Sequence, residues 1–235
     1  MTHQEDNKIL KTSIIISVMI VFLPWVIIAI EAGLNDRFTN LGIYPLKGVG
    51  ILGIATHWLV HGDLKHLISN TFPFFISLFM LFYHYRKIAF EVLIYIALTT
   101  GFWVWMIGRD NSVHIGASGL IYGLESFIIL SGILSKNKRL MAAGLILIFL
   151  HGGLIYGLIA GFFDQKISYE AHIAGFFAGI LYAFWFKNRL NKTPKVKIQY
   201  IAYIELQNYW LYQNNSAQNK PLLRYKYEEN SASQD

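Results

Sequence analysis

The chain contains six apolar runs that are each about long enough to cross a lipid bilayer, and this feature limits its fold more than any other. A membrane-spanning helix needs roughly 20 predominantly apolar residues. The runs fall at residues 13–31, 64–84, 89–107, 115–134, 140–163 and 169–187. Because lipid cannot hydrogen-bond to the backbone, segments of this kind have to be helical. We therefore expect an all-α integral membrane protein built around a bundle of six transmembrane helices.

The composition agrees with a membrane protein and argues against two other classes. Only 14% of the 235 residues are charged, whereas a soluble domain carries roughly 25%. The net charge is +6, but the basic residues gather at the ends of the apolar runs rather than along one soluble face, so we expect no nucleic-acid partner. The chain has no cysteine, which excludes disulfides and cysteine-ligated metals.

The lysine and arginine residues predict the orientation of the runs. One set of connections is rich in these residues and contains Lys8, Lys11, Arg86, Lys87, Lys136, Lys138, Arg139, Lys187 and Arg189. The other set spreads fewer of them over longer loops, namely Arg37, Lys47, Lys65, Arg109 and Lys166. The positive-inside rule then places both termini in the cytoplasm. We expect the membrane to be a cell inner membrane or plasma membrane. Under this orientation the helices at 115–134 and 169–187 both begin at the outer face.

Residues 191–235 differ in character from the rest of the chain because they are polar and rich in Asn, Gln and Ser. Within them, residues 197–212 are aromatic and partly alternating, which fits a short strand, an interfacial segment or a partner-binding segment. The composition favours a largely disordered cytoplasmic tail. We therefore divide the chain into a cytoplasmic N-terminus (1–12), a six-helix domain (13–190) and this tail.

Three motifs lie near the predicted outer ends of the helices. The first is the run GASG, which opens the helix at 115–134 and contains Gly116, Ser118 and Gly119. Its small residues suit close helix packing and also leave the serine hydroxyl uncovered. Tyr122 lies four residues after Ser118 and so shares its helix face.

The second motif is AHIAGFFAG, in which His172, Gly175 and Gly179 fall on one face of the helix at 169–187. The two glycines are typical of a groove for a partner helix. Helix packing does not explain the histidine, because ionisable residues within membrane helices are costly and are usually functional.

The third motif is HWLVHGDLKHLISN, at residues 57–70. Gly62 interrupts it, and Asp63 is a suitable N-cap for the helix at 64–84. After this cap, His66 and Asn70 are four residues apart and share a face, so both can donate hydrogen bonds into the bundle.

The three motifs together supply the parts of a serine nucleophile. A serine hydroxyl needs a neighbouring base, which is usually an imidazole, and the predicted depths of Ser118 and His172 match. Attack on an amide forms an oxyanion that needs donors already in place. His66, Asn70 and the backbone N–H of Ser118 are the candidates for these donors.

In combination, GASG with Tyr122, AHxxGxxxG and HxxxN resemble the rhomboid family of intramembrane serine proteases over roughly residues 13–190. The resemblance implies a six-helix core and a Ser–His dyad that cleaves transmembrane protein substrates within or beside their membrane segments, without metal or cofactor. It implies that Ser118 is the nucleophile and that His172 is the general base. It also implies that His66 and Asn70 line the oxyanion hole, that Tyr122 stacks on the histidine and that Gly175 and Gly179 allow close helix contact.

Several residues fall outside this pattern. The first outer loop lacks the Trp-Arg pair of many members, and Tyr156 is the candidate for an aromatic gate residue. We interpret Glu125 as a structural group, with His151 as its candidate partner. Three carboxylates are expected in the outer loops without an assigned role, namely Asp110, Asp164 and Glu170.

Three other functions compete with a protease. A zinc site could use several of the histidines, namely His57, His61, His66, His114 and His172. Gly62 separates these ligands, however, and no HExxH motif is present. A rhomboid-like protein without activity would bind membrane clients, but such proteins generally lack the serine or the histidine. A transporter would need ionisable residues along a path through the bilayer, whereas most polar residues here share one depth.

Overall fold

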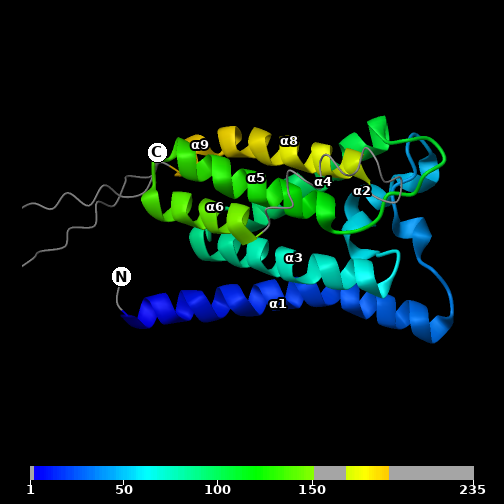
Figure 1. The fold of residues 1–235 in the computed structure, drawn as a ribbon, viewed down its shortest axis with the longest axis horizontal. Coiled ribbons are helices and arrows are strands. Elements are labelled where there is room, and N and C mark those ends of the chain that lie inside the picture. Colours follow the sequence, from blue (N-terminus) through cyan, green and yellow to red (C-terminus); the bar gives the residue numbers. More distant parts are fainter. Residues whose placement is uncertain (1–2, 151–167, 191–235) are drawn as a thin grey trace, which may run out of the picture. The chain divides into compact units, whose positions relative to one another are not determined.

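A computed structural model describes residues 3–150 and 168–190, and these residues form a bundle of helices (Figure 1). The longer helices are α1 (His3–Leu34), α3 (Leu64–His84), α4 (Ala89–Ile107), α5 (Ser118–Leu134), α6 (Lys138–Leu150) and α8 (Tyr169–Trp185). The short elements are η1 (Thr39–Leu41), η2 (Gly48–Gly50), α2 (Gly53–Thr56), η3 (His57–Leu59) and α9 (Lys187–Leu190). Within the described ranges, the only isolated β-bridge joins Ile43 to His114.

Three helices in the described part of the chain are long and apolar enough to cross a membrane, namely Gln4–Leu34, Leu64–His84 and Ala89–Ile107. Helices α5 and α8 have 17 residues each, which corresponds to about 25 Å at 1.5 Å per residue. They are therefore slightly shorter than the thickness of a bilayer core, which is about 30 Å. The predicted helical, multi-pass membrane character is confirmed. The count of six spans stays a prediction, since the run at 140–163 lies partly outside the described residues.

Helices α1 and α5 begin away from the starts of their apolar runs, whereas α3, α4 and α8 begin where the sequence predicts. Helix α1 starts at His3, ten residues before the apolar run, because acidic Glu5 and Asp6 in its first turn favour a helix N-terminus. Helix α5 starts at Ser118, three residues later than expected, because Gly116 has a φ of +108°. Helix α3 begins directly after Asp63, whose carboxylate accepts a hydrogen bond from the backbone N–H of His66 at 2.7 Å. This N-cap is the one that the sequence predicts.

The loop between α1 and α3 packs against the end of α4 and against the segment that leads into α5. Ile43 and His114 exchange two backbone hydrogen bonds of 2.9 Å each. Helix α2 lies so close to α4 that a side chain at Gly101 would collide with the carbonyl of Ile54. These contacts hold the chain just before Ser118 against the loop.

Helix α5 lies at the centre of the bundle. It packs most extensively on α8 and also contacts α3, α4 and α6. Figure 1 shows α8 (yellow) running beside α5 (green), with α1 (blue) beside α3 (cyan). The α5 side chains between Gly119 and Ile128 are buried. The serine at the start of this helix therefore stands on the most enclosed element of the fold.

A serine–histidine pair between α5 and α8

The hydroxyl of Ser118 and the imidazole of His172 meet at the interface between α5 and α8. The distance between Ser118 Oγ and His172 Nε2 is 2.9 Å, which is within hydrogen-bonding range. Ser118 is the first residue of α5, and His172 lies in the first turn of α8. His172 is 7% exposed, while Ser118 is half-buried. The structure therefore brings together the two residues that the sequence proposes as nucleophile and base.

Glycines set the distance between the two helices. A Cβ at Gly175 would overlap the carbonyl oxygen of Gly119, and a Cβ at Gly179 would overlap Ser126 Oγ and the carbonyl oxygen of Gly123. The backbones of α5 and α8 are thus in direct contact along this line, as small residues permit. We call this line of contact the glycine seam. It places His172 within reach of Ser118.

The ring of Tyr122 lies flat against the ring of His172. Their centroids are 4.3 Å apart and their planes differ by 8°. Tyr122 stands one turn after Ser118 in α5, which is the position that its spacing predicts. This stacking limits the rotation of the imidazole and so helps to keep Nε2 directed at the serine.

Gly116 shapes the approach to Ser118. Its φ of +108° is a conformation that residues with a side chain rarely adopt. A Cβ at this position would also lie 2.7 Å from Cε1 of His66 and 3.6 Å from Nδ2 of Asn70. The N–H of Gly116 donates to the carbonyl of His57 at 2.9 Å. Glycine therefore lets His66 and Asn70 approach the backbone two residues before the serine.

His61 holds the amide of Asn70. Asn70 Nδ2 lies 3.1 Å from His61 Nε2, and the backbone N–H of Ala117 also points to this nitrogen at 3.4 Å. An N–H donor needs an acceptor, so Nε2 of His61 is unprotonated and its proton is on Nδ1. Burial lowers the pKa of His61 to about 4, which keeps the ring neutral and able to accept.

The contact between His61 and Asn70 is not predicted from the sequence, in which His61 is a candidate metal ligand only. The spacing of nine residues gave no helical signal, because Gly62 and Asp63 separate His61 from the helix that carries Asn70. His57 is also engaged, since its Nδ1 lies 3.0 Å from the carbonyl oxygen of Gly53. Within the ranges that the structure describes, no group of three or more His, Cys, Asp or Glu residues could hold a metal ion.

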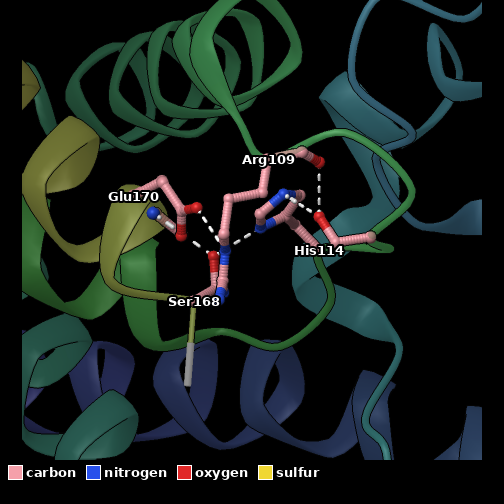
Figure 2. Close-up of polar contacts among 6 residues, drawn as sticks. Arg109, His114, Ser168 and Glu170 are labelled. Carbon is pink, nitrogen blue, oxygen red and sulfur yellow. Dashed lines mark hydrogen bonds and ion pairs between the residues drawn. The ribbon is translucent and has the colours of Figure 1, made fainter. Parts of the chain in front are cut away.

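The expectation that Glu170 lies in an outer loop is wrong. It lies in the first turn of α8, is 6% exposed and pairs with Arg109, whose Nε is 2.6 Å from Glu170 Oε1. Figure 2 shows this pair beside His114 and Ser168. The predicted helix at 169–187 already includes Glu170, and this was the available signal that the residue lies on a helix. The pairing with Arg109 has no local signal in the sequence.

Glu125 lies in the interior of the bundle with no exposed surface. Its Oε1 accepts a hydrogen bond from the hydroxyl of Ser77 in α3 at 3.2 Å. This contact between helices is consistent with a structural role. The proposed partner His151 lies outside the described residues, as do Tyr156 and Asp164.

Comparisons with known proteins agree with the motifs. Residues 50–189, more than half of the chain, match the family described as Rhomboid domain. An uncharacterized protein of Mycobacterium tuberculosis is 28% identical over 169 residues, which is 69% of this chain and 70% of that protein. A putative rhomboid protein of Acanthamoeba polyphaga mimivirus is 31% identical, over 58% of this chain and 75% of its own length. The rhomboid protease GlpG of Pectobacterium atrosepticum is 28% identical, over 76% of this chain and 63% of its own length. This chain belongs to the rhomboid family.

Proposed function

We propose that this chain is an intramembrane serine endopeptidase that uses a Ser118–His172 dyad. The observation that carries the proposal is the 2.9 Å contact between Ser118 Oγ and His172 Nε2, with Tyr122 stacked on the imidazole. A hydroxyl in contact with a positioned imidazole is the arrangement that activates a serine. The substrates are transmembrane or juxtamembrane segments of other membrane proteins, and no metal or cofactor takes part.

The reaction runs in two acyl transfers. Ser118 Oγ attacks the carbonyl carbon of the scissile peptide while His172 Nε2 accepts the hydroxyl proton. His172 then gives this proton to the leaving amine, and an ester between Ser118 and the substrate remains. A water molecule gives its proton to His172 and attacks the ester, and the proton returns to Ser118 as the acid product leaves. After both proton transfers, Ser118 again carries its hydroxyl proton and His172 is again neutral.

The oxyanion of each tetrahedral intermediate needs donors on the side of Gly116. The amide of Asn70 has two N–H groups, so the one that contacts His61 leaves a second available. His66 lies against Gly116, and the backbone N–H of Ser118 is at the start of α5, where helix N–H groups lack partners within the helix. We assign the oxyanion hole to these three groups. Removal of one such donor typically lowers kcat by about 100-fold to 1,000-fold.

The proposed setting is a plasma membrane or bacterial inner membrane that the chain crosses six times, with both termini in the cytoplasm. Ser118 and His172 then lie below the outer surface, where water reaches them from outside. A substrate helix hides its carbonyl carbons within its own hydrogen bonds, so it has to unwind before attack. Segments with glycine or proline near the outer face should therefore be cut faster than a uniform leucine helix, which a paired cleavage assay measures.

The test combines cleavage with active-site labelling. The protein is co-expressed with a single-span reporter substrate, and the purified protein is treated with a fluorophosphonate probe that modifies activated serines. Wild type should cleave and be labelled, whereas Ser118→Ala should do neither and His172→Ala should lose nearly all of both activities. Ser135→Ala is the matched control, because this serine lies at the far end of α5 and its hydroxyl contacts only the carbonyl of Gly132 among the described residues. Folded wild type that neither cleaves nor reacts with the probe would instead indicate a protein that binds membrane clients without cutting them.

A further inference from the structure

A chain of polar contacts joins the segment before α5 to the start of α8. His114 Nδ1 lies 2.6 Å from Ser168 Oγ, and His114 Nε2 lies 2.8 Å from Ser112 Oγ. Ser112 Oγ in turn donates to the carbonyl oxygen of Arg109 at 2.6 Å. The side chain of Arg109 forms the ion pair with Glu170 (Figure 2). We call these five residues the clamp.

The donors and acceptors of the clamp can be assigned without conflict. The one proton of the Ser112 hydroxyl goes to the Arg109 carbonyl, so Ser112 Oγ accepts from His114 Nε2–H. His114 Nδ1 is then an acceptor for the hydroxyl proton of Ser168. Ser168 Oγ also accepts from the backbone N–H of Ala171 at 3.3 Å, as the N-cap of α8. The two serine hydroxyl protons and the imidazole proton are each used once when His114 is neutral.

The surroundings favour this neutral state and an intact ion pair. Burial lowers the pKa of His114, against an opposing effect of Glu170. Glu170 is 6% exposed and Arg109 is 32% exposed at its side chain. The guanidinium of Arg109 also lies over the ring of Tyr169, 5.2 Å from its centroid. Removing either member of such a pair is costly, because the buried Glu170 carboxylate would lose its partner or Arg109 would lose the charge it faces.

The position of the clamp relates it to the dyad. His114 precedes Ser118 by four residues, and Ser168 precedes His172 by four residues. The His114–Ser168 contact therefore joins the two segments at the same sequence distance from the dyad. The backbone of His114 is also fixed to Ile43 by two hydrogen bonds. The start of α8 is therefore fastened to a segment that is itself anchored to the first loop.

The glycine seam alone does little to prevent α8 from sliding along its own axis against α5. Glycines bring two backbones close, but they provide few interlocking side chains against sliding along the helix axis. A hydrogen bond from Ser126 to the carbonyl of Phe176, at 2.9 Å, fixes the seam two turns away from Ser118. At the end near the dyad, the clamp adds contacts between the segment before α5 and the start of α8, and these contacts oppose sliding.

We propose that Arg109, His114 and Glu170 are positioning residues for the dyad, which hold α8 in the register that keeps His172 Nε2 on Ser118 Oγ. This role rests on the proposed protease function. The residues touch neither substrate nor the reacting atoms, and they act through the placement of α5 and α8. Loss of the clamp should therefore slow the chemical step while substrate binding stays nearly unchanged.

The experiment compares neutral replacements in the full-length detergent-solubilised protein. Arg109→Gln and Glu170→Gln should each lower kcat and the rate of fluorophosphonate labelling by about tenfold or more, since small misplacements of reacting groups have large effects. KM should stay within about twofold, because the affected interaction acts on the dyad and not on substrate binding. The double variant should be no slower than the slower single one, because the two residues act as one unit. Arg109→Lys keeps the charge and should recover most of the rate.

Ser126→Ala is the matched control, because it removes a contact of the same seam at the other end. All variants are compared at equal folded amounts, with the unfolding temperature measured in parallel. The proposal is overturned if the clamp variants keep the wild-type kcat and labelling rate, or if Ser126→Ala loses as much rate for the same drop in unfolding temperature. Inactive and unlabelled wild type would instead refute the protease function itself, so the two failures are distinguishable.

Discussion

Replacing Gly119 by alanine tests whether the glycine seam sets the geometry of the dyad. The added Cβ would lie 2.9 Å from the carbonyl oxygen of Ala171, 3.1 Å from Cγ2 of Thr100 and 3.2 Å from Cβ of Ala171. Ordinary carbon contacts begin at about 3.5 Å. The start of α8 therefore has to move by about 0.5 Å, because the closest contact is to its backbone.

Ala171 directly precedes His172, so this movement carries the imidazole with it. The distance between His172 Nε2 and Ser118 Oγ is 2.9 Å. It would become about 3.4 Å, beyond the roughly 3.2 Å limit of a good hydrogen bond. A misplacement of 1 Å can cost about 100-fold in rate, so half of that distance should cost about tenfold in kcat. Overpacking costs about 1–3 kcal/mol of stability, which the better helix propensity of alanine offsets by about 1 kcal/mol.

The assay is steady-state cleavage of a fluorogenic transmembrane substrate in detergent, with folded protein quantified by thermal unfolding. Gly33→Ala is the control, since a Cβ there meets nothing within 4 Å, and it should retain the wild-type rate. Gly175→Ala should lower kcat more than Gly119→Ala does, because its Cβ would overlap the carbonyl of Gly119 itself. A wild-type kcat for folded Gly119→Ala would refute the reasoning, as would a loss that only follows the amount of folded protein.

Three further predictions concern other residues. Burial lowers the pKa of His57 and His61 from 6.5 to about 4. As the pH falls below 6.5, the two imidazoles become protonated in the unfolded chain before they do so in the folded protein. The free energy of unfolding should therefore be highest above pH 6.5 and decrease by roughly 3 kcal/mol per ring as the pH falls toward 4. Thermal unfolding across this range should show the fall, His61→Gln should reduce it, and a flat wild-type profile would contradict it. Tyr122→Phe keeps the stacked ring and should retain most of the wild-type kcat, whereas Tyr122→Ala should lower kcat by about tenfold; equal rates for the two would argue against stacking as the cause. Glu125→Ala should lower folded yield more than activity per folded molecule, and loss of activity at normal yield, measured by size-exclusion chromatography and cleavage, would count against a structural role.

The sequence predicts the helices best where a local signal marks each end. Asp63 marks the start of α3, and the bounds of α3 and α4 agree with the apolar runs at 64–84 and 89–107. The apolar run continues through Gly116, so the sequence predicts the start of α5 three residues too early. The left-handed backbone at that residue follows from contacts with His66 and His57, which are distant in sequence.

In the candidate site too, residues with a local sequence signal are predicted, whereas contacts between distant segments are not. Ser118 and His172 are singled out by the motifs GASG and AHxxGxxxG, and helix spacing then places Tyr122 on the same face as Ser118. The role of His61 depends on a loop that folds back onto Asn70, and the pairing of Arg109 with Glu170 joins segments 61 residues apart. A single sequence holds no local pattern for such contacts, because they form only when the loops pack.

The glycine seam divides α8 into two faces with different freedom to change during evolution. The face toward α5 carries Gly175 and Gly179, where any larger side chain would meet main-chain or hydroxyl oxygen. The opposite face carries bulky side chains with large exposed fractions, namely Phe177, Leu181, Phe184 and Trp185. A lipid environment accepts any apolar residue there, so we expect homologous sequences to drift freely on that face while the inner stripe stays small. An overall identity near 28% with a distant relative is then compatible with an unchanged helix pair.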